Sequence, residues 1–201
     1  SFNYEYTKNL FKLAKESNVK KFIFLSTIHV YSDFLKGLIT IKSKRLNNDP
    51  YAFSKRKAED ILINSSIKKT QVIILRLSNV YGIVQNKNFK LSNSFVHQFC
   101  KEIVNKKRIT INNYDKMYRN LISLNKLNQV ITYIINQNYK SGKVYNVGGK
   151  FSYKLIEIAS IISDRYFALS GNKSKIISKK ILRKKTDPLR YKINFPINFT
   201  D

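Results

Sequence analysis

Two short apolar runs with a helical pattern between them dominate the first half of the chain. Residues 21–26 read Lys-Phe-Ile-Phe-Leu-Ser, and residues 71–76 read Gln-Val-Ile-Ile-Leu-Arg. Continuous apolar runs of this length are typical of strands buried inside a parallel sheet. Between them, residues 51–66 place Ala58 and Leu62 at helical spacing. The order strand, helix, strand predicts a βαβ unit.

The second half of the chain shows the helical period in three further stretches. Apolar residues recur there at intervals of three and four, which predicts helices over residues 91–104, 125–138 and 151–163. Residues 174–191 form a basic stretch, in which we expect a strand and a loop facing the substrate.

Four residues in the βαβ unit suggest chemistry. Thr27 and Asn79 each follow a predicted strand, and ligands of such sheets bind outside the carboxyl ends of the strands. Tyr51 and Lys55 are four residues apart and would share one helix face. A free phenol has a pKa of about 10, and a nearby ammonium favours the phenolate and lowers that pKa. The spacing alone arises by chance in many helices, but with Thr27 it predicts a proton-handling site for an alcohol or carbonyl.

Six segments, in order, resemble those of a known enzyme family. They cover residues 3–7, 26–31, 50–59, 75–82, 119–125 and 142–149. The third matches Pro-Tyr-x-x-x-Lys-x-x-x-Glu, and the fourth matches Leu-Arg-x-x-Asn-Val-Tyr-Gly. The chain thereby resembles the extended short-chain dehydrogenase/reductases, in particular the NAD-dependent epimerase/dehydratase group that acts on nucleotide sugars. It departs from the family pattern at Tyr6 and Ser32, which replace glycines, and at Asn120 and Asn125, which replace acids.

The resemblance implies a fold, a cofactor and a set of site residues. The fold is a Rossmann-like, doubly wound parallel α/β sheet with a smaller α/β substrate lobe, and the cofactor is NAD or NADP. Tyr51 would be the acid/base, Lys55 would hold the nicotinamide ribose, and Thr27 would hydrogen-bond the reacting oxygen. The implied cofactor contacts are Asn3, Tyr51, Lys55 and Ser78. The implied substrate contacts are Thr27, Asn79, Lys184 and Arg190, with Lys184 a point charge where the family has the bidentate fork of arginine.

Other polar residues have weaker claims to a role in the site. An arginine that ends a strand more often forms a local ion pair, so we expect this of Arg76. Glu59 is expected on the helix surface or at an interface. A role for His29 near the substrate competes with a satisfied loop histidine, which is the favoured interpretation. His97 is expected to be structural.

The family's opening strand and Gly-x-x-Gly-x-x-Gly turn, which let a pyrophosphate approach a helix N-terminus, do not occur in these 201 residues. Asn3 already aligns beyond the family's third strand. We therefore expect the carboxyl-terminal part of a longer enzyme, with residues 1–82 as the remainder of the Rossmann core and residues 83–201 as mostly the substrate lobe. The alternative is a non-catalytic remnant or binding module that has lost the cofactor half. An in-frame glycine-rich turn in the upstream nucleotide sequence would decide between them.

Composition adds few constraints. The net charge is +26 and the pI about 10.1, which suggests nucleic-acid binding. However, the lysines are scattered in small groups, and abundant Asn, Ile, Phe and Tyr indicate AT-rich codons, so we expect no nucleic-acid partner. A single cysteine excludes a disulfide framework and a cysteine-based zinc site, and we expect no metal. No stretch suits a membrane span. A cytoplasmic enzyme, homodimeric when complete, is the expectation.

Overall fold

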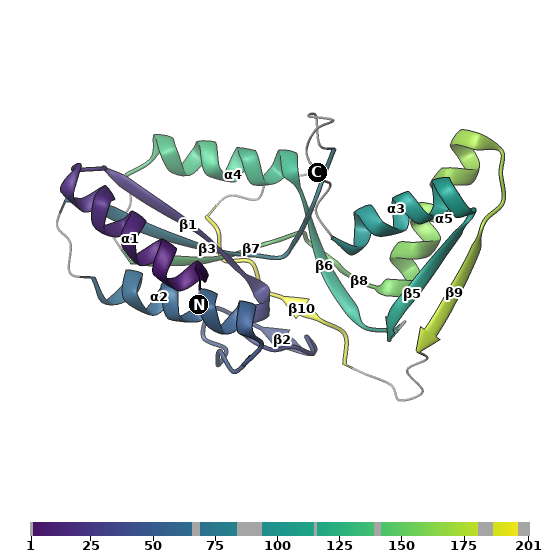
Figure 1. Ribbon diagram of the computed structural model, residues 1–201, viewed down its shortest axis with the longest axis horizontal. Coiled ribbons are helices and arrows are strands. Elements are labelled where there is room, and N and C mark those ends of the chain that lie inside the picture. Colours follow the sequence, from purple (N-terminus) through teal and green to yellow (C-terminus); the bar gives the residue numbers. More distant parts are fainter. Residues whose placement is uncertain are drawn as a thin grey trace.

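The computed structural model describes residues 2–65, 69–83, 94–114, 116–138, 142–180 and 187–196. A parallel three-stranded sheet forms one end of the molecule (Figure 1). Its strands are β1 (Lys21–Thr27), β3 (Gln71–Leu77) and β7 (Lys143–Val147), in the order β1-β3-β7. Thr27 pairs with Leu77, which pairs with Val147, so the three carboxyl ends lie level at one edge of the sheet.

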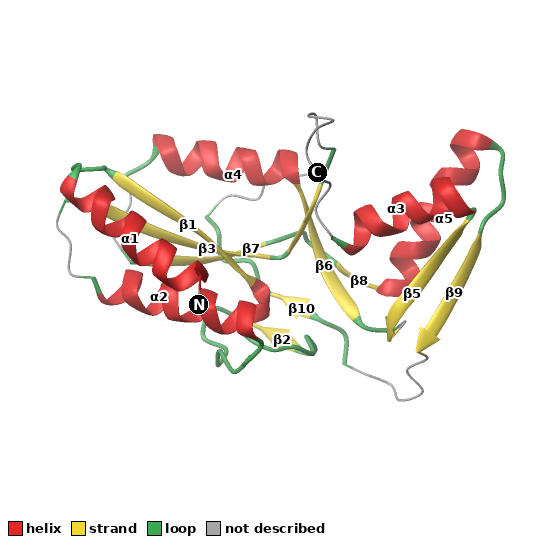
Figure 2. Ribbon diagram, viewed as in Figure 1, coloured by secondary structure: helices red, strands yellow, loops and turns green. Residues whose placement is uncertain are grey.

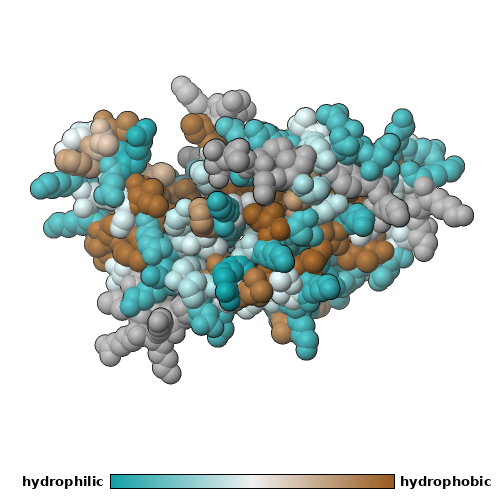
Figure 3. Space-filling model, turned by 180° about the vertical axis from the view of Figure 1, so that it is seen from behind, coloured by the Kyte–Doolittle hydropathy of each residue, from teal (hydrophilic) through white to brown (hydrophobic). Residues whose placement is uncertain are grey.

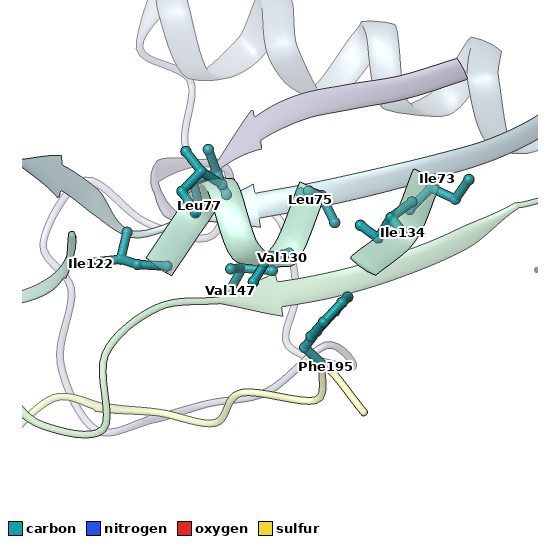
Figure 4. Packing of buried hydrophobic residues seen from close by; sticks show 9 residues of the cluster. Ile73, Leu75, Leu77, Ile122, Val130, Ile134, Val147 and Phe195 are labelled. Atoms are coloured by element: carbon teal, nitrogen blue, oxygen red, sulfur yellow. The ribbon is translucent and has the colours of Figure 1, made fainter. Parts of the chain in front are cut away.

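The central strand β3 supplies alternate side chains to two hydrophobic cores, as its period of two requires. Ile73 and Leu75 point to one face, where they pack with α4 (Leu124–Asn136) around Ile134 (Figure 4). Val72 and Ile74 point to the other face, toward Phe11, Phe24 and Leu62. Helices thus cover both faces of the sheet (Figure 2), which explains why β3 reads as a continuous apolar run.

Two helices lie on the second face. They are α1 (Phe2–Glu16) and α2 (Pro50–Asn64). The start of α2 follows from its sequence, since Pro50 occupies the first turn and the Asp49 carboxylate accepts hydrogen bonds from the Tyr51 and Ala52 amides. The 3-10 turn η1 (Ile28–Val30) joins β1 to the segment that leads to α2.

Strand β1 lies at an edge of the sheet, because in the described part of the chain it pairs with β3 alone. The Leu25 side chain is 40% exposed, and Ile23 only partly joins the α4 core. The apolar run predicts a strand with neighbours on both edges, and the exposure of Leu25 is what we expect of such a strand when one neighbour is missing.

The other end of the molecule is a smaller lobe. It contains two sheets among the described residues. One has the strand order β4-β6-β8, with β4 (Asn79–Tyr81), β6 (Tyr118–Ser123) and β8 (Ser152–Lys154), and the other is the parallel pair β5 (Arg108–Tyr114) and β9 (Lys175–Lys180). Helices α3 (Phe95–Lys106) and α5 (Leu155–Ser170) pack on the second pair. The parallel pair β2 (Leu38–Ile39) and β10 (Arg190–Tyr191) lies between the two ends (Figure 1).

The predicted α/β class with a parallel sheet is confirmed, as are the strands and helix of the βαβ unit. The helix predicted over residues 151–163 is displaced. Ser152–Lys154 instead forms a strand antiparallel to β6, and α5 begins only where Glu157 bonds back to the Lys154 amide. Residues 91–93 of the helix predicted over residues 91–104 lie outside the described part. No helix in the described ranges is long and apolar enough to cross a membrane.

Candidate active site

The candidate site lies at the carboxyl ends of the three parallel strands. Thr27 is the last residue of β1, Ser78 follows β3 and Gly148 follows β7. The Thr27 side chain is buried, and its hydroxyl accepts a hydrogen bond of 3.2 Å from the His29 amide. This bond caps η1 and thereby turns the chain away from the end of β1.

Helix α2 brings Tyr51 and Lys55 to the same end of β1. The Lys55 ammonium donates a hydrogen bond of 2.9 Å to the Leu25 carbonyl and lies 4.8 Å from the centre of the Phe24 ring. It lies 5.9 Å from the centre of the Tyr51 ring, and Tyr51 is 50% exposed. The structure therefore places Tyr51, Lys55 and the end of β1 together.

The protonation of this pair differs from our expectation. Burial raises the pKa of the Tyr51 phenol above its ordinary value, whereas we expected Lys55 to lower it. Burial lowers the pKa of Lys55, and the Glu59 carboxylate partly opposes that shift. The expected lowering of the phenol pKa is wrong for this structure, because burial raises that pKa, and the ammonium donates to the Leu25 carbonyl. Tyr51 is a neutral phenol at neutral pH, which is the state of a proton donor.

Ser78 carries a buried hydroxyl that lacks a hydrogen-bond partner among the described residues. The side chain is 5% exposed, and its backbone amide donates to the Val147 carbonyl at 2.9 Å. Gly148 leaves room for the side chains of Ser78 and Asn120, since a methyl group at Gly148 would lie 3.0 Å from Ser78 Oγ and 2.3 Å from Asn120 Oδ1. A buried hydroxyl without a partner costs about 1–3 kcal/mol. Such a group at a strand end is suited to a ligand.

A buried ion pair lies beneath these residues. The Arg76 guanidinium donates to Glu59 at 2.7 Å, which confirms the local ion pair predicted for Arg76. The prediction for Glu59, a helix-surface or interface residue, is wrong, because its side chain is 0% exposed. The sequence period of α2 places Glu59 beside Leu62 on the inner face, and its cationic partners, Arg76 on β3 and Arg45, make that position tolerable for a carboxylate.

Arg119 is a site residue that the sequence did not identify. It is 9% exposed, and its Nη1 donates to the Tyr118 carbonyl at 3.0 Å. Over the described residues, no carboxylate lies within ion-pair distance of its guanidinium. Burial lowers its pKa, and Asp33 partly opposes this shift. The available signal was that Arg119 opens one of the family-like segments of the sequence. The burial of Arg119 beside the buried Asn120 is a property of the packed strand β6.

The two histidines differ in setting. Burial and the Arg119 charge lower the pKa of His29, which is half-buried two residues beyond Thr27. The satisfied-histidine interpretation of His29 stays a prediction. His97 has Ser94 Oγ at 2.7 Å from one ring nitrogen and the Gly82 carbonyl at 2.8 Å from the other, which confirms its structural role.

The remaining predicted residues lie at different places. The Asn79 amide donates to the Asn120 carbonyl at 3.0 Å and so joins β4 to β6. Arg190 is exposed on β10, at a pocket of about 340 Å³ that Lys150, Phe151 and Lys192 also line. The Asn3 backbone lies in α1, its side chain is outside the described part, and Lys184 lies outside it altogether. No cluster of His, Cys, Asp or Glu suited to a metal ion occurs among the described residues.

Comparison with known proteins decides the family. The model of the NAD dependent epimerase/dehydratase family matches residues 2–148 of the chain. The chain belongs to this family.

The chain is similar in sequence to two kinds of family member. The dTDP-D-glucose 4,6-dehydratase of Dictyostelium discoideum is 29% identical over 172 residues, which cover 78% of this chain and 37% of that protein. The ADP-L-glycero-D-manno-heptose-6-epimerase of Brachyspira hyodysenteriae is 26% identical over 172 residues, covering 84% of this chain and 53% of that protein. The chain thus spans about half or less of these relatives.

A solved structure confirms the fold. The UDP-N-acetylglucosamine 4-epimerase of Methanobrevibacter ruminantium, in complex with UDP-N-acetylmuramic acid, superposes with a TM-score of 0.75 at 21% identity. The match covers 95% of this chain and 59% of that chain. The Rossmann-like fold class is confirmed.

Proposed function

We propose that the protein is an NAD(P)-dependent epimerase or reductase of a nucleotide sugar, acting by hydride transfer with Tyr51 as acid/base. The observation that carries the proposal is the joint placement of Thr27, Tyr51 and Lys55 at the carboxyl edge of the sheet, in a chain of the epimerase/dehydratase family. The alternative, a binding module without turnover, predicts ligand binding with no product.

The residues at the strand ends fit a nicotinamide cofactor. The buried Ser78 hydroxyl offers a donor and an acceptor at the end of β3. Lys55 and Tyr51 would hold the ribose, and Asn3 would contact the cofactor from α1. NAD or NADP would supply the hydride acceptor. The Lys55 ammonium, which donates to the Leu25 carbonyl, lies 5.9 Å from the centre of the Tyr51 ring.

The chain's own residues would then manage one proton. The Thr27 hydroxyl would hydrogen-bond the reacting oxygen and hold it against the Tyr51 phenol. Reduction of a carbonyl needs a proton donor, for which the neutral phenol is suited. Oxidation of an alcohol needs the phenolate, which Lys55 would stabilise once its ammonium turns from the Leu25 carbonyl to the phenol.

Cations near the site suit a sugar-nucleotide diphosphate. Arg119 is a buried guanidinium with no carboxylate partner in the described ranges, close enough to His29 to lower its pKa. Its fork geometry matches phosphate oxygens. Asn79, Arg190 and Lys184 are proposed as further substrate contacts, Arg190 through the pocket shared with Lys150. The basic surface is assigned to attraction of this anion and not to nucleic acid.

We further propose that the working enzyme places a glycine-rich cofactor half beside β1. Two features of the described residues support this: the free edge of β1 with its exposed Leu25, and an exposed apolar row on α1 formed by Tyr6, Leu10 and Leu13. Tyr4 lies near the Lys57 ammonium of α2. Because Tyr4 is two residues from Tyr6, the two side chains lie on different sides of α1. The apolar row therefore faces away from α2. A polypeptide that contains these residues and such a half is called the complete enzyme below.

Two coarser features complete the proposal. We place the complete enzyme in the cytoplasm, because the single cysteine of these 201 residues offers no disulfide that would require an oxidising compartment. We propose a homodimer through the outer faces of α1 and α2, where Phe53 and Ile63 are exposed. Light scattering of the complete enzyme at micromolar concentration tests the second point.

The experiment for the proposed function is product analysis. The complete enzyme would be incubated with a panel of UDP-, dTDP- and ADP-sugars, once with NAD or NADP as hydride acceptor and once with NADH or NADPH as hydride donor. The products would be separated by chromatography and assigned by NMR. Conversion of at least one nucleotide sugar, with inversion or carbonyl reduction at one carbon, supports the proposal. Saturable ligand binding without any product would favour the binding module instead.

A further inference from the structure

Glu59 forms a buried network of directional hydrogen bonds. Its carboxylate accepts from Arg76 Nη2 at 2.7 Å and from Arg76 Nε at 3.1 and 3.2 Å. The same carboxylate accepts from the Ser26 hydroxyl at 2.5 Å and from Arg45 at 3.0 Å. The Glu59–Arg76 contact therefore satisfies most of the carboxylate's acceptor sites in a space closed to solvent.

The network continues beyond the ion pair to other strands. Arg76 Nη1 donates to the Tyr31 hydroxyl at 2.8 Å, and this hydroxyl donates to Asn146 Oδ1 at 2.6 Å. The Tyr191 hydroxyl donates to the Arg76 carbonyl at 2.6 Å. Arg76 thus joins five elements through its guanidinium and its carbonyl: α2, the end of β1, β3, β7 and β10.

Each part of the network lies next to a residue of the candidate site. Glu59 is one helical turn beyond Lys55 on α2, and Ser26 immediately precedes Thr27. Arg76 is two residues before Ser78, and Asn146 is two residues before Gly148. A change in the network would shift α2 relative to the strand ends, and with it the distance between the Thr27 hydroxyl and the Tyr51–Lys55 face.

We propose that Glu59 and Arg76 are positioning residues of the active site, whose ion pair fixes α2 against the carboxyl ends of β1 and β3. This inference rests on the proposed function. The pair touches neither cofactor nor substrate and acts through Thr27, Tyr51 and Lys55.

Energetics favour a positioning role over a purely stabilising one. A buried ion pair often gives no more stability than apolar side chains of similar volume, because desolvation offsets the attraction. What it adds is geometry, since the bidentate contact has one orientation. Catalytic groups need placement within about 0.5 Å. The Glu59 charge also partly opposes the lowering of the Lys55 pKa by burial.

The test compares variants of the complete enzyme at a temperature where each is folded by circular dichroism. Glu59→Gln removes the charge and keeps the shape, and Glu59→Asp keeps the charge on a shorter stem. Ile109→Ala is the control, because Ile109 is fully buried in the β5 core of the other lobe. It lowers stability without touching the network. The measured quantities are kcat, KM and the dissociation constant of the cofactor.

A positioning role predicts that Glu59→Gln lowers kcat at least tenfold while the cofactor dissociation constant changes less than twofold. Glu59→Asp should recover part of kcat, and Ile109→Ala should keep kcat within twofold. Should Glu59→Gln not fold, Ser26→Ala removes only the hydroxyl that donates to Glu59 and should lower kcat about threefold or more. The inference would be overturned if the folded Glu59→Gln variant had the kcat of the wild type. If Glu59→Gln does not fold, a wild-type kcat in Ser26→Ala would overturn it instead.

Hydrogen exchange gives a readout that needs no turnover. The folded network variants should exchange faster than the wild type at the amides of residues 27–31 and in the first turns of α2, and Ile109→Ala should not. Unchanged exchange there refutes the positioning role even if the enzyme is active. Absence of product from the wild type, with the exchange result as expected, refutes only the proposed function.

Discussion

The charge of the buried Arg119 guanidinium lowers the pKa of the His29 imidazole. Burial is the larger cause, and the carboxylates of Asp33 and Asp49 act in the opposite direction without cancelling it. The histidine and the arginine come from the turn after β1 and from β6, so this relationship ties the catalytic strand end to the smaller lobe. Protonation of His29 would place two cations side by side in a poorly solvated space.

The first prediction is a loss of stability in mild acid. The pKa of His29 in the folded state lies below its ordinary value of 6.5, so below pH 6.5 the unfolded chain binds a proton that the folded one does not. The free energy of unfolding should therefore fall as the pH drops from about 6.5 toward the folded-state pKa. Urea denaturation of the complete enzyme at pH 7.5 and 5.5 measures the difference. In His29→Gln this contribution should vanish, and an unchanged pH dependence would contradict the assignment.

The second prediction concerns Arg119 as a phosphate contact. Arg119→Lys keeps the charge and loses the fork, so KM for the nucleotide sugar should rise about tenfold while kcat changes less than threefold. The control is Arg108→Lys, an exposed arginine in β5, which should leave both constants unchanged. Equal KM values for Arg119→Lys and the control would show that Arg119 does not contact the diphosphate of the substrate.

The third prediction narrows the reaction. By resemblance, the 4,6-dehydratases carry an Asp-Glu pair directly after the catalytic threonine, and here those positions are Ile28 and His29. Isoleucine transfers no proton, and Ile28 is buried in the cluster around Val30 and Tyr191. We expect epimerisation or carbonyl reduction, although the relatives include dehydratases as well as epimerases. NMR detection of a 4-keto-6-deoxy sugar as the main product would contradict this expectation.

Much of the fold follows from local sequence. The apolar runs of β1 and β3 and the Asp49–Pro50 start of α2 are signals that need no tertiary information. The short strands carry no such signal, because β4 and β8 of the smaller lobe and the pair β2 and β10 have three residues or fewer. Their conformation depends on partners distant in sequence, as the displaced start of α5 shows.

The candidate site, like the fold, has features that follow from local sequence and features that depend on tertiary packing. The spacing of Tyr51 and Lys55 is local and was predicted from the sequence. The burial of Glu59 and the absence of a carboxylate beside Arg119 in the described ranges are properties of the packed chain. Neither could be predicted, since each depends on which strand lies opposite. The predicted direction of the Tyr51 pKa shift was wrong for the same reason, because the shift comes from burial of the phenol in the packed chain.

The fourth prediction concerns the 201-residue chain made alone. The free edge of β1 and the exposed Leu25 invite association of copies. Elsewhere the surface carries separate apolar patches among hydrophilic side chains (Figure 3). We expect the chain alone to be poorly soluble or partly folded and to show no measurable binding of NADH by fluorescence or calorimetry.

A matched pair of variants locates the cause. Leu25→Thr should raise the soluble fraction, measured by light scattering after centrifugation, because it places a polar group at the β1 edge. Leu169→Thr changes a leucine that is 74% exposed at the end of α5 and should have little effect. A monodisperse monomer that binds NADH at micromolar concentration would contradict the need for a second half.

The central claim, that Tyr51 is the acid/base, is tested most directly by the turnover of Tyr51→Phe in the complete enzyme. This change removes one oxygen from a half-exposed ring and leaves Lys55 and Thr27 in place. The account predicts that kcat falls by on the order of a hundredfold or more, while the dissociation constant of NAD, measured by calorimetry, stays nearly unchanged. Lys55→Met, by contrast, should weaken both. A Tyr51→Phe enzyme with near-normal kcat would contradict the account.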